Sequence, residues 1–117
     1  MKLLTQANLK ALPAERTTEG KPEDQQIAVV KLFTPDADWT WFLLETWEEG
    51  GERMFYVYEA AMGGCGYTYT NLSTLERLRG PLGLRVERDR YFDPTPMTDV
   101  KKELQGKGYP AYFLPTD

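Results

Sequence analysis

The chain contains no histidine and only one cysteine in its 117 residues. Histidine is the commonest general base and a frequent zinc ligand, so its absence excludes Ser-His-Asp and Cys-His catalysis and the usual zinc centres. The lone Cys65 cannot form an internal disulfide or a multi-thiolate metal site, which excludes an oxidised secreted scaffold. It lies between two glycines with no lysine or arginine beside it to activate the thiol, so we expect it to be inert.

Long hydrophobic runs and a strong charge of one sign are also missing. No segment approaches the roughly 20 apolar residues of a membrane-spanning helix, and the first ten residues, MKLLTQANLK, lack the apolar core of a signal peptide. Fourteen basic and eighteen acidic residues give a net charge of −4, without the dense positive field that carries non-specific DNA binding. We therefore expect a soluble cytoplasmic protein with no membrane contact, no cofactor and no general affinity for DNA.

The residues that are present suffice for one folded domain. Apolar residues make up 41% and aromatic residues 13% of a chain of typical domain length, so we expect residues 1–117 to form a single domain. β-branched and aromatic stretches alternate with short turns rich in Gly, Pro and Asp, which predicts strands that follow one another along the chain. The expected strands cover residues 27–34, 39–46, 53–61 and 67–71, with a less regular fifth strand at 84–92.

Three short helices complete the expected architecture, over residues 5–12, 73–79 and 98–105. Thr5 is a predicted N-cap of the first, and Ser73 with Glu76 matches a capping box for the second, which ends before Gly80. The aromatic segment 108–115 is expected to pack back on the domain. Because the connections among the first four strands are too short for crossover helices, the sequence predicts an α+β domain with a four- to five-stranded, mostly antiparallel meander sheet.

Carboxylates occur at two places that could contribute to a metal site. Asp36 and Asp38 lie in the first predicted hairpin turn, and hard cations such as Mg²⁺ prefer oxygen ligands. Aspartate in a turn more often serves the turn itself, and Glu87 and Asp89 would contribute only if the fold brought them across. The acidic-x-lysine pair of a restriction-type nuclease is missing from the next strands. These four residues are therefore weak metal candidates, and a metal-dependent phosphodiesterase or nuclease is an alternative hypothesis.

The densest charged cluster is Glu87-Arg88-Asp89-Arg90. In an extended segment, Glu87 and Asp89 would face one side and Arg88 and Arg90 the other. The arginines could bind phosphate or the carboxylates of a partner. The same pattern also fits a set of ion pairs at a sheet edge, so both interpretations stay open.

Aromatic residues at alternate positions could form a stacking platform for single-stranded nucleic acid. Their neighbours are glutamates rather than basic residues, which leaves a nucleic-acid binder as an alternative only. We expect Trp39 and Trp41 in the core. The tyrosines are candidates for a protein-binding surface, where this residue type is enriched. They are Tyr56, Tyr58, Tyr67 and Tyr69.

Four stretches of the sequence stand out together: MKLLT at the start, VVKLFTPDADWTWF at 29–42, LSTLERLRGPLGLRVERDRYF at 72–92 and the DPTPM that follows. Their most specific motifs are FTP-x-x-x-WTW and RGP-x-G-x-x-x-ERD. In these stretches the chain resembles a bacterial family, domain-of-unknown-function family 2958. The chain departs from the family's usual Gly-Tyr-Phe-Ser at 68–71. The resemblance implies no catalytic residues. It implies a small protein of plasmids, phages and integrative elements with a role in element maintenance or in resisting host defences.

These observations favour a non-enzymatic accessory protein that binds another protein. In the setting that the resemblance implies, it would inhibit or adapt a host defence system or a nucleic-acid-processing machine. The expected contact combines the tyrosine-bearing sheet face with Arg88 and Arg90.

Overall fold

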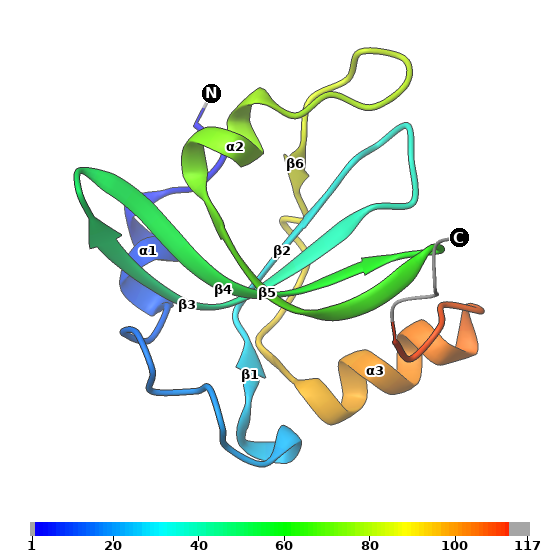
Figure 1. The fold of residues 1–117 in the computed structure, drawn as a ribbon, viewed down its shortest axis with the longest axis horizontal. Coiled ribbons are helices and arrows are strands. Elements are labelled where there is room, and N and C mark those ends of the chain that lie inside the picture. Colours follow the sequence, from blue (N-terminus) through cyan, green and yellow to red (C-terminus); the bar gives the residue numbers. More distant parts are fainter. Residues whose placement is uncertain (1, 113–117) are drawn as a thin grey trace.

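The computed structural model describes residues 2–112, and its main feature is a five-stranded antiparallel sheet with strand order β5-β4-β3-β2-β6 (Figure 1). Successive hairpins join β2 to β5, which gives the predicted meander. The strands are β2 (Val30–Phe33), β3 (Thr40–Glu49), β4 (Glu52–Ala61), β5 (Gly64–Asn71) and β6 (Glu87–Arg88). A separate two-stranded sheet pairs β1 (Ile27–Ala28) with β7 (Thr95–Pro96).

Three α-helices accompany the sheets, which confirms the predicted α+β class. They are α1 (Gln6–Ala11), α2 (Leu72–Arg77) and α3 (Met97–Gly106), with a short 3₁₀ turn η1 (Glu23–Gln25) in the loop before β1. Thr5 caps α1 as predicted, because its hydroxyl accepts a hydrogen bond from the Asn8 N–H. No helix within residues 2–112 is long and apolar enough to cross a membrane.

The prediction for the second helix was wrong about its ends. Asn71, rather than Ser73, caps α2: its side-chain oxygen accepts a hydrogen bond of 2.8 Å from the Thr74 N–H. Ser73 is instead bound by the carboxylate of Glu52, to which its hydroxyl donates at 3.0 Å. The helix stops at Arg77, earlier than predicted, because the chain becomes extended at Leu78.

Two predicted strands are shorter than expected. The segment 27–34 divides into β1 and β2, which pair with different strands, β7 and β3, although the Val29 N–H still donates to the Leu43 carbonyl. In the segment 84–92 only β6 is a strand of the sheet. It ends where the Asp89 side chain accepts a hydrogen bond from the Tyr91 N–H, a local turn that diverts the chain from the ladder.

Both faces of the sheet are buried, under different helices, and we name them after α2 and α3. The α2 face packs against α1, α2 and the N-terminal residues, and its buried core is Leu4, Leu12, Val30, Leu32, Trp41, Leu43, Phe55, Val57, Leu75 and Val86. The α3 face packs against α3, and its buried core is Ala28, Phe42, Leu44, Tyr56, Tyr58, Ala60, Cys65, Met97, Val100 and Leu104. Apolar side chains therefore alternate along β3 between two separate cores.

The start of the expected C-terminal tail packs as predicted. Tyr109 lies against the α3-face core, and its hydroxyl donates to the Asp38 carbonyl at 3.0 Å. The remainder of this prediction, beyond residue 112, lies outside the described residues.

Asp36 connects the first hairpin turn to the loop after α2. Its carboxylate accepts hydrogen bonds from the N–H groups of Leu82, at 2.8 Å, and Leu84, at 3.4 Å. Gly80 lies directly against this carboxylate, so that a Cβ at residue 80 would be 1.6 Å from Oδ1 and 2.2 Å from Cγ of Asp36. Only glycine fits at residue 80 while the carboxylate keeps this position.

We expect the Gly80→Ala variant to lower the free energy of unfolding by about 2–3 kcal/mol, because its methyl group must displace the Asp36 carboxylate from the loop amides. Urea denaturation measures the change. Gly63→Ala is the matched control, since nothing lies within 4 Å of the methyl group that it adds. Equal unfolding midpoints for the two variants would contradict the proposed contact.

Candidate functional site

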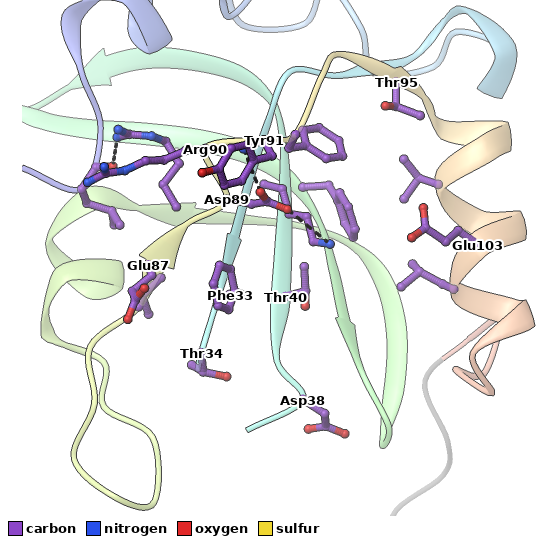
Figure 2. A pocket seen from close by; sticks show the side chains of 18 of the residues that line it. Phe33, Thr34, Asp38, Thr40, Glu87, Asp89, Arg90, Tyr91, Thr95 and Glu103 are labelled. Carbon is purple, nitrogen blue, oxygen red and sulfur yellow. Dashed lines mark hydrogen bonds and ion pairs between the residues drawn. The ribbon is translucent and has the colours of Figure 1, made fainter. Parts of the chain in front are cut away.

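Helix α3 covers only part of its face of the sheet and leaves a groove of about 1080 Å³ beside it (Figure 2). Phe33, Thr40 and Phe42 contribute to its floor from β2 and β3. α3 borders one side, with Glu103 labelled there, and the segment around Tyr91 borders the other (Figure 2). The groove therefore has an aromatic floor and polar walls from two elements that are distant in the sequence.

The pairing of β6 with β2 decides which charges face this groove. Glu87 lies opposite Phe33 and Arg88 opposite Leu32 in the ladder. Directly opposed residues share a face, so Glu87 points to the groove side. Arg88 points to the α2-face side, where its guanidinium donates to the Leu3 carbonyl. The arginine that we proposed as a contact residue is thus part-buried and fastens the N-terminal segment.

Asp89 and Lys31 lie together in the groove. Their charged atoms are 3.9 Å apart, and the Lys31 ammonium lies 5.8 Å from the centroid of the Phe42 ring. Such partly exposed pairs contribute little to stability, so both groups stay available to a ligand at small cost. Arg90 and Tyr91 follow at the rim, and Tyr91 is 94% exposed.

The four carboxylates considered as metal ligands do not come together. Asp36 binds the loop amides and does not line the groove, whereas Asp38 accepts a hydrogen bond from the Met62 N–H at 3.0 Å. Glu87 lies in β6, and Asp89 follows directly after that strand. Within residues 2–112, no three Asp, Glu, Cys or His side chains form a group that could hold a metal ion.

The tyrosine-bearing sheet face is largely covered, contrary to the expected exposed surface. Tyr56 is 7% and Tyr58 3% exposed. Tyr67 stacks on Tyr56 with centroids 5.7 Å apart, and Lys101 of α3 lies 4.7 Å from the centroid of the Tyr67 ring. Tyr67 is half-buried, and only Tyr69, at 55%, is mostly exposed. The tyrosines are covered because the apolar side of α3 packs on this face of the sheet.

The remaining aromatic and thiol predictions concern the core. Trp41 is buried in the α2-face core and Trp39 packs against it, with its indole N–H donating to Glu59 at 2.5 Å. The buried Trp41 ring is not open to stacking by bases, and the Trp39 ring is half-buried. Cys65 is buried on the other face, where burial raises the pKa of its thiol. An inert thiol is consistent with that position.

Burial also raises the pKa values of the covered tyrosines. The pKa of Tyr56 rises to about 12, mainly through desolvation and then through the nearby Glu19 carboxylate. Desolvation likewise raises the pKa values of Tyr58 and Tyr67. The neutral phenol is therefore the form that the α3-face core accommodates.

This shift predicts a specific loss of stability in alkaline solution. The pKa of Tyr56 in the folded protein exceeds the unfolded value of about 10, so its contribution is intact below pH 10 and falls as the pH rises from about 10 to 12. We expect Tyr56→Phe to lessen this fall by about 1–2 kcal/mol. Urea denaturation of both proteins across that pH range measures the difference. Identical pH profiles for both proteins would show that the Tyr56 phenol is not responsible.

The structure thus defines an α+β fold built on a five-stranded antiparallel sheet, in which β2 to β5 form a meander, with a groove beside α3. Residues 3–105 match the model of the family described as "Protein of unknown function (DUF2958)", and the chain belongs to this family. This confirms the resemblance found in the sequence. Searches of curated proteins and of solved structures found no match.

Sequence reasoning identified part of the groove. Glu87, Asp89, Arg90 and Asp38 were candidates, and all four line it. The floor residues were missed because their pattern is that of ordinary strand positions. Tyr91 was missed too, although an aromatic side chain between charged residues was a usable signal.

Proposed function

We propose that this protein is a non-enzymatic binding protein that holds a segment of another protein in the groove between β6 and α3. The observation that carries the proposal is the aromatic floor combined with walls of both charges. The basic lining residues whose charge can face the groove are Lys2, Lys31, Arg85, Arg90 and Lys107, and the acidic ones are Asp38, Glu87, Asp89, Asp93 and Glu103. An aromatic centre inside a polar rim is the usual composition of a protein-binding site.

The mixed charge favours a polypeptide over nucleic acid. Phosphate backbones are bound by surfaces of uniformly positive charge, and the carboxylates here would repel them. A polypeptide can instead match both signs along its length. A metal-dependent phosphodiesterase would need Asp36, Asp38, Glu87 and Asp89 to converge, and their separate positions give that alternative no support.

The proposed setting is that of a cytoplasmic accessory protein of plasmids, phages or integrative elements. The support is the setting that the family resemblance implies, together with the single cysteine of the chain, which fits a reducing compartment. A small protein that binds without catalysing can inhibit or adapt a host defence or nucleic-acid-processing machine by occupying one of its surfaces. The bound segment would then belong to that machine.

Tyr91 provides the sharpest test because it is exposed and its removal should leave the fold intact. Peptides selected by the whole chain from a random-sequence display library should shift backbone NMR signals of the groove residues. Tyr91→Ala should weaken their binding about tenfold or more, as the loss of an aromatic anchor does. Tyr112→Ala, which removes another exposed tyrosine from outside the groove, should leave the affinity unchanged.

Three outcomes would overturn the proposal. They are a library that yields no binding peptide, peptides whose signals map elsewhere, and a Tyr91→Ala variant with unaltered affinity. Calorimetric titration with Mg²⁺ and Mn²⁺ covers the enzymatic alternative. Micromolar metal binding that is lost in the Asp36→Ala, Asp38→Ala double variant would favour the phosphodiesterase.

A further inference from the structure

The two edges of the five-stranded sheet differ in how they are protected. β6, at one edge, has two residues and lies within a run of charged side chains, and both features discourage another strand from pairing. β5, at the other edge, has eight residues with no charge and no proline. It pairs with β4 over its whole length without a register shift, so no bulge interrupts it.

The outer side of β5 is a template for strand pairing. In an antiparallel ladder, every second residue of an edge strand directs its N–H and C=O groups away from its neighbour. Within residues 2–112, no strand pairs with that side, because the sheet ends at β5 (Figure 1). Natural proteins usually block such an edge, and the open edge here is able to accept another strand.

An acidic pocket of about 370 Å³ borders the same strand, on the α3 face. Its lining includes the exposed ring of Tyr69 from β5 and the ring of Trp47, whose centroid is 6.0 Å from that of Tyr69. Four glutamates and one arginine supply the charged side chains, namely Glu15, Glu19, Glu45, Glu49 and Arg16. Carboxylates beside aromatic rings are the surroundings that a cationic side chain prefers.

The buried Glu45 side chain fixes the loop of residues 16–19 that borders this pocket. A register shift in β3 after Leu43 places Glu45 opposite Tyr56, on the α3 face, where it is buried. Its carboxylate accepts hydrogen bonds from the N–H groups of residues 16, 18 and 19, at 2.7, 2.7 and 2.8 Å. Since Glu45 is fully bonded, the charge available to a ligand comes from Glu15 and Glu49, with Glu19 accepting from the Tyr69 hydroxyl.

We propose that the β5 edge binds an extended segment of another protein as an added strand, with a lysine or arginine opposite Tyr69. The cation of that residue enters the acidic pocket, while the backbone hydrogen bonds provide the pairing. A second copy of this chain fits less well, because Gly64–Asn71 brings no basic side chain to the pocket. This surface lies at the edge opposite β6 and is separate from the groove.

The test uses the whole chain and three capped hexapeptides. Val-Lys-Val-Lys-Val-Lys places all its cations on one face of a strand, Val-Glu-Val-Glu-Val-Glu reverses the charge, and Val-Val-Val-Lys-Lys-Lys keeps the composition without the alternation. Only the first should bind tightly, and it should slow hydrogen exchange of alternate β5 amides by about tenfold or more. High salt should weaken its binding.

Charge variants test the pocket itself. Glu15→Gln with Glu49→Gln should lower the affinity for the lysine peptide about fivefold, which is the effect expected from two exposed charge contacts. Asp24→Asn with Glu76→Gln removes the same charge from exposed positions outside the pocket, and it should leave the affinity unchanged.

Several results would overturn this inference while leaving the groove proposal intact. Equal binding of the lysine and glutamate peptides would remove the role of charge. Binding without protection of β5 amides would place the peptide elsewhere. Protection of β5 that grows with protein concentration in the absence of peptide would identify a second copy as the occupant.

Discussion

Burial of the β3–β4 hairpin on both faces is the constraint on which the rest of the structure depends. Residues 40–46 of β3 and 55–58 of β4 are all buried, so this pair of strands cannot stand at a water-exposed surface. The segments before and after the hairpin must cover it, α1 and α2 on one face and α3 on the other. In a chain of this length, few residues lie outside the hairpin to cover its two faces.

The positions of both candidate surfaces follow from the limits of this covering. α3 spans ten residues and lies closest to η1, β7 and β1, and its Lys101 contacts the rings of Tyr58 on β4 and Tyr67 on β5. The β2 and β6 part of that face is left as the groove. On the far side, β5 covers one edge of β4 but has nothing of its own to pair with among residues 2–112. Because too few residues are present to cover the whole sheet, the groove stays open on one side and, within the described part of the chain, the edge of β5 stays unpaired on the other.

The meander could be predicted from the sequence because its signals are local. Alternating apolar residues and the turns at 35–38 and 50–51 specify each hairpin, and Thr5 specifies the start of α1. The predictions that were wrong concern features that depend on contacts between residues distant in the sequence. Ser73 matches a capping box, but Glu52 on β4 binds it and Asn71 takes the cap instead. No local pattern reveals a competitor that lies on another strand.

The candidate sites were harder to predict for the same reason. Glu45 would lie on the α2 face if β3 alternated strictly, and the register shift after Leu43 moves it to the α3 face beneath the loop of residues 16–19. Tyr56 and Tyr58 have the spacing of an exposed row as much as of a buried one. Which of the two applies depends on where α3 packs, and that is decided by Met97, Val100 and Leu104 together. The residue types and their alternation along a strand predict which side chains share a face, but they do not predict which other element covers that face.

The two stretches that carry the family resemblance lie side by side in the structure. FTP-x-x-x-WTW spans the β2–β3 hairpin, and RGP-x-G-x-x-x-ERD leads into β6, which pairs with β2. Their residues divide between two tasks. Gly80 and Trp41 build the junction, through the contact with Asp36 and through core packing, while Phe33, Thr40, Glu87 and Asp89 line the groove. The pairing of β6 with β2 positions β6 and also turns Glu87 and Asp89 toward Phe33. We therefore expect a chain that carries both stretches to form both the contact between the two loops and the floor of the groove.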